Sequence, residues 1–158
     1  MKIKKGSRHA KIVGDFGEHL VCNWLSRSGF EVSVVDHTGI DLVAYDPRNK
    51  KRLGITVKSR TRLPGTETTI VNVFRRDERA KLTEACEAFA CEPWIAIYVE
   101  TRQAADLYLT SLKNYEATYD RAATVIAGFQ MTDKLKQKYA SDPQVRDVHI
   151  EFSSRKWF

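Results

Sequence analysis

Four side chains have types and spacings that could do chemistry together: Glu18, Asp41, Thr56 and Lys58. The last three flank a turn at residues 46–50, Asp-Pro-Arg-Asn-Lys, and alternating apolar residues predict a strand on each side of it. If the two strands pair symmetrically about this turn, Asp41 lies directly opposite Thr56, with Cβ atoms about 5 Å apart. Lys58 is two residues further on and points to the same face. The sequence therefore predicts a carboxylate, a hydroxyl and an ammonium group side by side on a sheet.

Glu18 lies in a predicted helix, at the edge of its apolar arc. On a helical wheel it shares a face with apolar and small residues at offsets of −4, +3, +4 and +7, namely Gly14, Val21, Cys22 and Leu25. A carboxylate in that position needs a partner, because an unpaired buried charge is costly. Glu18 is therefore a candidate for the same site.

Each position also has an ordinary structural explanation. Glu18 could form a salt bridge, Asp41 could bond its own backbone at the start of a strand, and Lys58 could be a solvated side chain. A slip of one residue in the strand register would also send the side chains to opposite faces. The coincidence of Glu18, Asp41 and Lys58 in one pattern favours a shared site.

The same residues carry a family resemblance. Gly39-Ile40-Asp41-Leu42, then Thr56-Val57-Lys58 fifteen residues after the aspartate, with Gly17-Glu18 in a preceding helix, resembles the PD-(D/E)XK nuclease superfamily. Holliday-junction resolvases, many restriction enzymes and some homing endonucleases belong to it. The resemblance covers roughly residues 12–100 in element order. It implies a restriction-endonuclease-like α/β fold, a mixed sheet flanked by helices with an α-β-β-β-α-β core.

The resemblance also implies an activity, the metal-dependent hydrolysis of phosphodiester bonds in DNA. Asp41 would ligate Mg²⁺ or Mn²⁺, Glu18 would help to hold the ion directly or through water, and Lys58 would orient or activate the attacking water. These roles agree with general chemistry, because Mg²⁺ prefers carboxylate oxygens and a lysine adds positive charge where the transition state becomes negative.

Thr56 departs from the family pattern, which has Glu or Asp at this position. A neutral hydroxyl is a weak Mg²⁺ ligand and brings no charge. The site would then depend on Glu18, on a more distant acid such as Glu67, or on a backbone carbonyl. The alternative function is a catalytically weakened or inactive nuclease fold that binds nucleic acid.

The positive charge is concentrated in two segments. The chain has a net charge of +6. Residues 1–14 carry five basic side chains and residues 48–62 carry seven, with no acid in either, so the rest of the chain sums to −6. Patches of this kind are typical of phosphate-backbone binding. A solvated surface, or a face for an acidic protein partner, is the competing explanation.

We expect the following residues to contact nucleic acid: Lys4, Lys5, Arg8, Lys11, Arg60, Arg62, Arg75 and Arg76. DNA is the expected partner. A homodimer would suit a nuclease that cuts both strands of a duplex.

Length and composition favour one globular domain spanning residues 1–158, with its core over about 12–112 and a C-terminal helix and strand within 131–152. The chain is 42% hydrophobic and 29% charged, with neither a disordered composition nor a long apolar run. No secretory signal is recognisable at the N-terminus, so we expect a cytoplasmic protein. Three cysteines at unrelated spacings are expected as thiols, with Cys22 and Cys86 in the core.

Periodicity predicts the elements that must position the site. Helices are expected at 13–28, 76–90 and for about ten residues from 131, and Val13, Phe16, Leu20 and Trp24 are expected to form the apolar face of the first. Leu82, Ala85, Cys86 and Phe89 are expected on one face of the second. Strands are expected at 30–34, 40–45, 53–59, 94–99, 105–112 and 148–152, with an apolar run at 70–74. The run at 94–99 has no alternation, which places it at the sheet centre. Residues 113–130 give no clear pattern.

Overall fold

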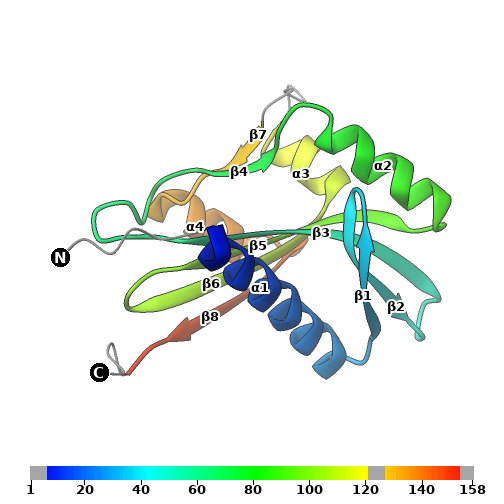
Figure 1. The fold of residues 1–158 in the computed structure, drawn as a ribbon, viewed down its shortest axis with the longest axis horizontal. Coiled ribbons are helices and arrows are strands. Elements are labelled where there is room, and N and C mark those ends of the chain that lie inside the picture. Colours follow the sequence, from blue (N-terminus) through cyan, green and yellow to red (C-terminus); the bar gives the residue numbers. More distant parts are fainter. Residues whose placement is uncertain (1–6, 121–126, 154–158) are drawn as a thin grey trace.

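A mixed sheet with helices on both faces organises the protein (Figure 1). The structure, a computed structural model, describes residues 7–120 and 127–153. The helices are α1 (Ser7–Arg27), α2 (Glu78–Ala88), α3 (Leu112–Thr118) and α4 (Asp133–Ser141). The strands are β1 (Glu31–His37), β2 (Ile40–Asp46), β3 (Lys51–Thr61), β4 (Val71–Phe74), β5 (Glu92–Glu100), β6 (Ala104–Ser111), β7 (Ala127–Phe129) and β8 (Val145–Glu151).

Six strands form the main sheet in the order β1-β2-β3-β5-β6-β8. Only β3 and β5 are parallel, because α2 carries the chain from one to the other; the remaining neighbours are antiparallel. The short strands β4 and β7 pair with each other in a second sheet. In Figure 1, α1 lies below the main sheet, and α2 and α3 lie above it.

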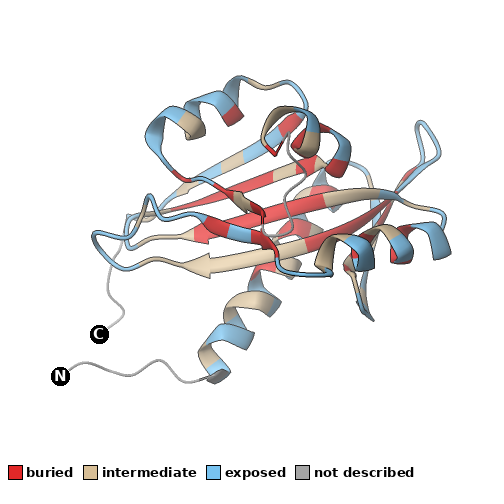
Figure 2. Ribbon diagram, turned by 90° about the horizontal axis from the view of Figure 1, so that it is seen from above, coloured by how far each residue is buried: buried red, intermediate tan, exposed pale blue. Residues whose placement is uncertain are grey.

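Each face of the main sheet has its own core. Val21 and Leu25 of α1 pack on Leu42, Ile55 and Ala96. On the opposite face, the cluster includes residues of α2, α3, α4 and the β4-β7 pair, among them Leu82, Tyr115, Phe129 and Tyr139. Figure 2 shows the buried residues concentrated along the central strands. The strands are thus fixed from both sides, which gives any side chain at a strand end a defined position.

The predicted strand register is confirmed. Leu42 lies opposite Ile55 and Asp46 opposite Lys51, so pairing is symmetric about the turn between them. The prediction that residues 94–99 lie at the sheet centre is also confirmed, since β5 lies between β3 and β6. The unclear segment 113–130 contains most of α3 and the three residues of β7.

Two predicted core positions are wrong. Phe16 is 52% exposed and Phe89 is 44% exposed. The buried row of α1 is Gly17, Val21 and Leu25, because α1 approaches the sheet along the side of its glycine. Phe89 falls in the turn after α2 and packs edge-on against His37 instead.

The cysteines give a mixed result: Cys86 is buried as predicted, whereas Cys22 is only half-buried. In the described part of the chain, no helix combines the length and the apolar character needed to cross a membrane.

Candidate active site

Asp41 lies where β2 and β3 separate. The ladder between these strands ends at the pair Leu42 and Ile55, and β3 continues beyond it with β5 alone. The Asp41 Oδ2 atom accepts a hydrogen bond from the backbone N–H of Val57 at 2.6 Å and another from the Thr56 hydroxyl at 3.3 Å. Beyond the end of the ladder, the main chain of β2 no longer pairs with β3. The Asp41 carboxylate takes its place as the hydrogen-bond acceptor for the Val57 N–H. It bonds the neighbouring strand rather than its own backbone.

Thr56 and Lys58 follow on the same side of β3. Thr56 is only 6% exposed. The Lys58 ammonium group lies 3.6 Å from a carboxylate oxygen of Glu78, and its side chain is 19% exposed. The predicted grouping of Asp41, Thr56 and Lys58 is present in the structure.

Glu78, in the first turn of α2, was not a candidate in the sequence analysis. Its Oε2 atom accepts a hydrogen bond from the backbone N–H of Arg75 at 2.7 Å, and its own N–H donates to the Arg75 carbonyl at 3.2 Å. The Glu78 carboxylate thus reaches back to a backbone donor three residues earlier, whereas the N-cap residue of α2 is Asp77, whose side chain makes no capping hydrogen bond. A Glu three residues after Arg75, at the start of an amphipathic helix, was the available signal. It could not show which strand the helix faces.

Gly39 brings α2 and β2 together. Its φ angle is +104°, and a Cβ at this position would lie 2.2 Å from the Lys81 carbonyl oxygen. Only glycine fits such a contact without a shift of backbone. The result is a pocket of about 210 Å³ between the start of β2, β3 and the first turns of α2. Its lining residues are Thr38, Gly39, Asp41, Thr56, Lys58, Phe74, Glu78 and Lys81.

Glu18 belongs to α1, which packs on the opposite face of the sheet from α2. A Cβ on Gly17 would lie 2.0 Å from the Ser59 Oγ atom, so the glycine allows α1 to pass close to β3 beside Lys58. Burial raises the pKa of Glu18, and the charges of Asp41 and Asp15 raise it further, whereas His19 and Lys11 lower it. Glu18 is not among the residues lining the pocket. Its carboxylate and that of Asp41 are nevertheless close enough to repel each other.

The oxygen-rich set fits a hard divalent cation. Asp41, Glu18 and Glu78 offer carboxylates and Thr56 offers a hydroxyl, which suits Mg²⁺ or Mn²⁺ better than softer metals. Within residues 7–120 and 127–153, no three His, Cys, Asp or Glu side chains lie close enough together to hold an ion by themselves. Mg²⁺ needs no such cage, because it usually keeps several waters and binds through one or two carboxylates.

The raised pKa of Glu18 gives a testable stability effect. We expect Glu18→Gln to raise the melting temperature of the metal-free protein at pH 7 by about 1–3 °C, as when one unfavourable charge interaction is removed from a domain of this length. A carboxyl group whose pKa is raised by folding destabilises the fold as pH rises above its ordinary value of 4.5. The difference between variant and wild type is therefore absent below about pH 4 and grows toward pH 7.

Thermal unfolding from pH 4 to pH 8 measures this effect. Glu87→Gln is the matched control, because Glu87 is exposed on α2, and it should show no comparable pH-dependent gain. A Glu18→Gln variant that is equally or less stable than wild type at pH 7 would contradict the expected repulsion from Asp41.

The predicted phosphate-contacting residues have different surroundings. Arg8, Lys11, Arg75 and Arg76 are exposed, and Lys11 forms an exposed ion pair with Asp15 at 3.5 Å. Lys4 and Lys5 lie outside the described residues.

Arg60 and Arg62 are partly buried. Arg60 donates to the carbonyl of Ser59, and Arg62 donates to the carbonyls of Thr69 and Ile70. Burial lowers the pKa of Arg62, and the charge of Arg60 lowers it further. Arg62 therefore ties together the two ends of the loop between β3 and β4.

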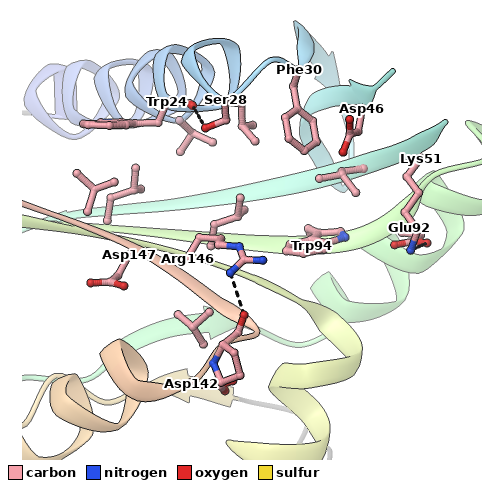
Figure 3. Close-up of a pocket in the computed structure, with 18 of the residues that line it drawn as sticks. Trp24, Ser28, Phe30, Asp46, Lys51, Glu92, Trp94, Asp142, Arg146 and Asp147 are labelled. Atoms are coloured by element: carbon pink, nitrogen blue, oxygen red, sulfur yellow. Dashed lines mark hydrogen bonds and ion pairs between the residues drawn. The ribbon is translucent and has the colours of Figure 1, made fainter. Parts of the chain in front are cut away.

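A larger hollow of about 930 Å³ lies between α1 and the β5-β6-β8 part of the sheet (Figure 3). Figure 3 shows Trp24 and Phe30 on one side of it and Trp94 on the sheet. Its charged rim includes the Lys51–Glu92 ion pair at 2.9 Å. Glu18, Asp41, Thr56 and Lys58 are not among its lining residues. Asp41, Thr56 and Lys58 therefore line the smaller pocket, and Glu18 lines neither of the two hollows.

Comparison with known proteins supports the fold. No family model matches the chain, and no curated protein matches its sequence. Among solved structures, it is similar to Hjc, a Holliday junction resolvase from the archaeal hyperthermophile Archaeoglobus fulgidus. The match has a TM-score of 0.50 and 18% identity, and it covers 76% of this chain and 91% of the resolvase. The predicted fold class is confirmed: the chain has the mixed sheet flanked by helices of this resolvase.

Proposed function

We propose that the protein is a divalent-metal-dependent nuclease that hydrolyses phosphodiester bonds in DNA. The observation that carries the proposal is the position of Asp41. Its carboxylate is fixed at the fork between β2 and β3, in a pocket that also contains Lys58 and within electrostatic range of Glu18. The same fold in a Holliday junction resolvase supports DNA as the substrate.

Each residue has a separate role in this proposal. Asp41 and Glu18 would hold Mg²⁺ or Mn²⁺, which when bound polarises a phosphodiester and lowers the pKa of a water. Lys58 would orient the attacking water and offset the negative charge that develops on the phosphate oxygens. The exposed basic residues Arg8, Lys11, Arg75 and Arg76 would contact the DNA backbone.

The activity is tested on labelled duplex, single-stranded and four-way-junction DNA with Mg²⁺, Mn²⁺ or EDTA. We expect cleavage of at least one of these substrates with either metal and none with EDTA. The junction is included because the similar structure is a junction resolvase. An unchanged cleavage rate in EDTA would contradict a metal-dependent site.

A second candidate function is a nuclease fold that binds DNA without cutting it, and Thr56 favours this candidate. Its hydroxyl is buried and donates to Asp41, so the position brings no negative charge to the pocket. Such a protein would bind DNA with the steep salt dependence of several phosphate contacts, yet no metal would produce cleavage. The Thr56→Glu variant separates the two: a gain of cleavage identifies a decayed site, and a loss shows that threonine suits an active one.

A further inference from the structure

The pocket contains a second carboxylate, and it comes from α2 rather than from β3. Glu78 and Asp41 both line the pocket. The Glu78 Oε1 atom faces Lys58 at 3.6 Å, while Oε2 is held by the backbone N–H of Arg75 at 2.7 Å. The side chain is 34% exposed. Glu78 is thus fixed at the mouth of the pocket by one hydrogen bond and one ion pair, with its charge directed toward Lys58.

The charge balance of the pocket depends on Glu78. The lining contains two acids, Asp41 and Glu78, and two bases, Lys58 and Lys81, so it is neutral. Without Glu78 the lining would carry a net charge of +1. A divalent cation is repelled by a positive pocket, and the repulsion is strongest where burial limits screening by water.

The size of the pocket suits an ion that keeps part of its hydration shell. Its volume of about 210 Å³ leaves room for a cation with several waters. Carboxylates at its wall can bind such an ion through the waters, which are donors.

We propose that Glu78 supplies from α2 the negative charge that Thr56 does not supply from β3, and that it binds the metal of the site through water. This inference rests on the proposed function. It assigns to the site a residue that the local sequence around Asp41 and Lys58 does not contain.

The Glu78→Gln variant tests the proposal, because glutamine keeps an oxygen that can accept from Arg75 and loses only the charge. We expect Mn²⁺ binding, measured by titration calorimetry, to weaken by about 10–100-fold, the usual effect of removing an outer-shell partner of a metal. Mn²⁺ should also raise the melting temperature less than in wild type. The matched control is Glu84→Gln, the same change at an exposed position of α2, which should bind Mn²⁺ as wild type does.

The double variant Thr56→Glu with Glu78→Gln moves the acid to β3. If the two positions are equivalent, it should recover most of the affinity that Glu78→Gln loses. If Mn²⁺ affinity does not recover in a double variant whose circular dichroism matches that of wild type, acids at positions 56 and 78 are not equivalent. Normal Mn²⁺ affinity with slower cleavage in Glu78→Gln would overturn the proposal too, because Glu78 would then act only through Lys58.

The failure of this inference is distinguishable from that of the proposed function. If Asp41→Asn abolishes Mn²⁺ binding and Glu78→Gln leaves it unchanged, the nuclease site stands and the role of Glu78 is overturned. If the wild-type protein shows neither Mn²⁺ binding nor metal-dependent cleavage, the proposed function fails, and the inference fails with it.

Discussion

Replacing Asp41 with asparagine is expected to reduce metal-dependent DNA cleavage by about 10²–10³-fold or more, the size of effect seen when a major electrostatic contribution to a transition state is removed. Asparagine has the same shape, and its side-chain oxygen can still accept from the Val57 N–H that Asp41 holds at 2.6 Å. The Thr56 hydroxyl donates to the same Oδ2 atom of Asp41, so it can keep its bond to the asparagine oxygen as well. The variant thus keeps the fork between β2 and β3 and loses the charge that a cation needs.

Single-turnover cleavage and Mn²⁺ calorimetry measure the effect. Mn²⁺ affinity should fall together with the cleavage rate, while DNA binding in EDTA should stay close to wild type, because the basic residues that contact phosphates are unchanged. Asp36→Asn, at an exposed position of β1, is the matched control. Cleavage at the wild-type rate in Asp41→Asn would show that the catalytic centre lies elsewhere.

The β2–β3 part of the site could be predicted because its determinants are local. The turn at residues 46–50 fixes the register of both strands, and the period of two then fixes which side chains share a face. Once Leu42 lies opposite Ile55, Asp41 and Thr56 must be neighbours on adjacent strands. The central position of β5 followed from its unbroken apolar run for a similar reason.

Contacts between elements distant in the sequence could not be predicted. Glu78 contacts Lys58 because α2 packs closely against Gly39. This close packing involves the backbone of Lys81, so the hydrophobic pattern of neither segment could predict it. Glu18 belongs to a helix on the other face of the sheet, and its approach depends on the fit of Gly17 against Ser59. The short strand β7 forms through its pairing with β4, and three residues are too few to show a period.

The same reasoning explains the error in the apolar face of α1. Hydrophobicity alone placed Phe16 on the buried face together with Leu20 and Trp24. Leu20 and Trp24 do pack against the core, but Phe16 is exposed, and the fully buried row is Gly17, Val21 and Leu25. A glycine lets a helix approach a sheet more closely, and the closer contact buries more of the strand residues. Glu18 adjoins this glycine and is half-buried, so its position at the edge of the arc that contains Val21 and Leu25 agrees with the helical-wheel prediction.

Lys58→Met is the second variant with a large expected effect, and it separates catalysis from metal binding. We expect cleavage to fall by about 10²–10³-fold, since the ammonium group no longer offsets the charge developing on the phosphate. Mn²⁺ affinity should stay the same or increase, because the lining is neutral with Lys58 and has a net charge of −1 without it. Stability should change by less than about 1 kcal/mol, because Glu78, the partner that loses its ion pair, is partly exposed.

Mn²⁺ affinity distinguishes the two variants: it is retained or increased in Lys58→Met, whereas in Asp41→Asn it falls together with cleavage. Lys113→Met, at an exposed position of α3, controls for the loss of one positive charge from a basic protein. If Lys58→Met loses Mn²⁺ affinity as well as cleavage, the ammonium group acts by holding the acidic side of the pocket in place. The proposal that Lys58 orients the attacking water and offsets charge on the phosphate would then be wrong. Its main role would be the ion pair that positions Glu78.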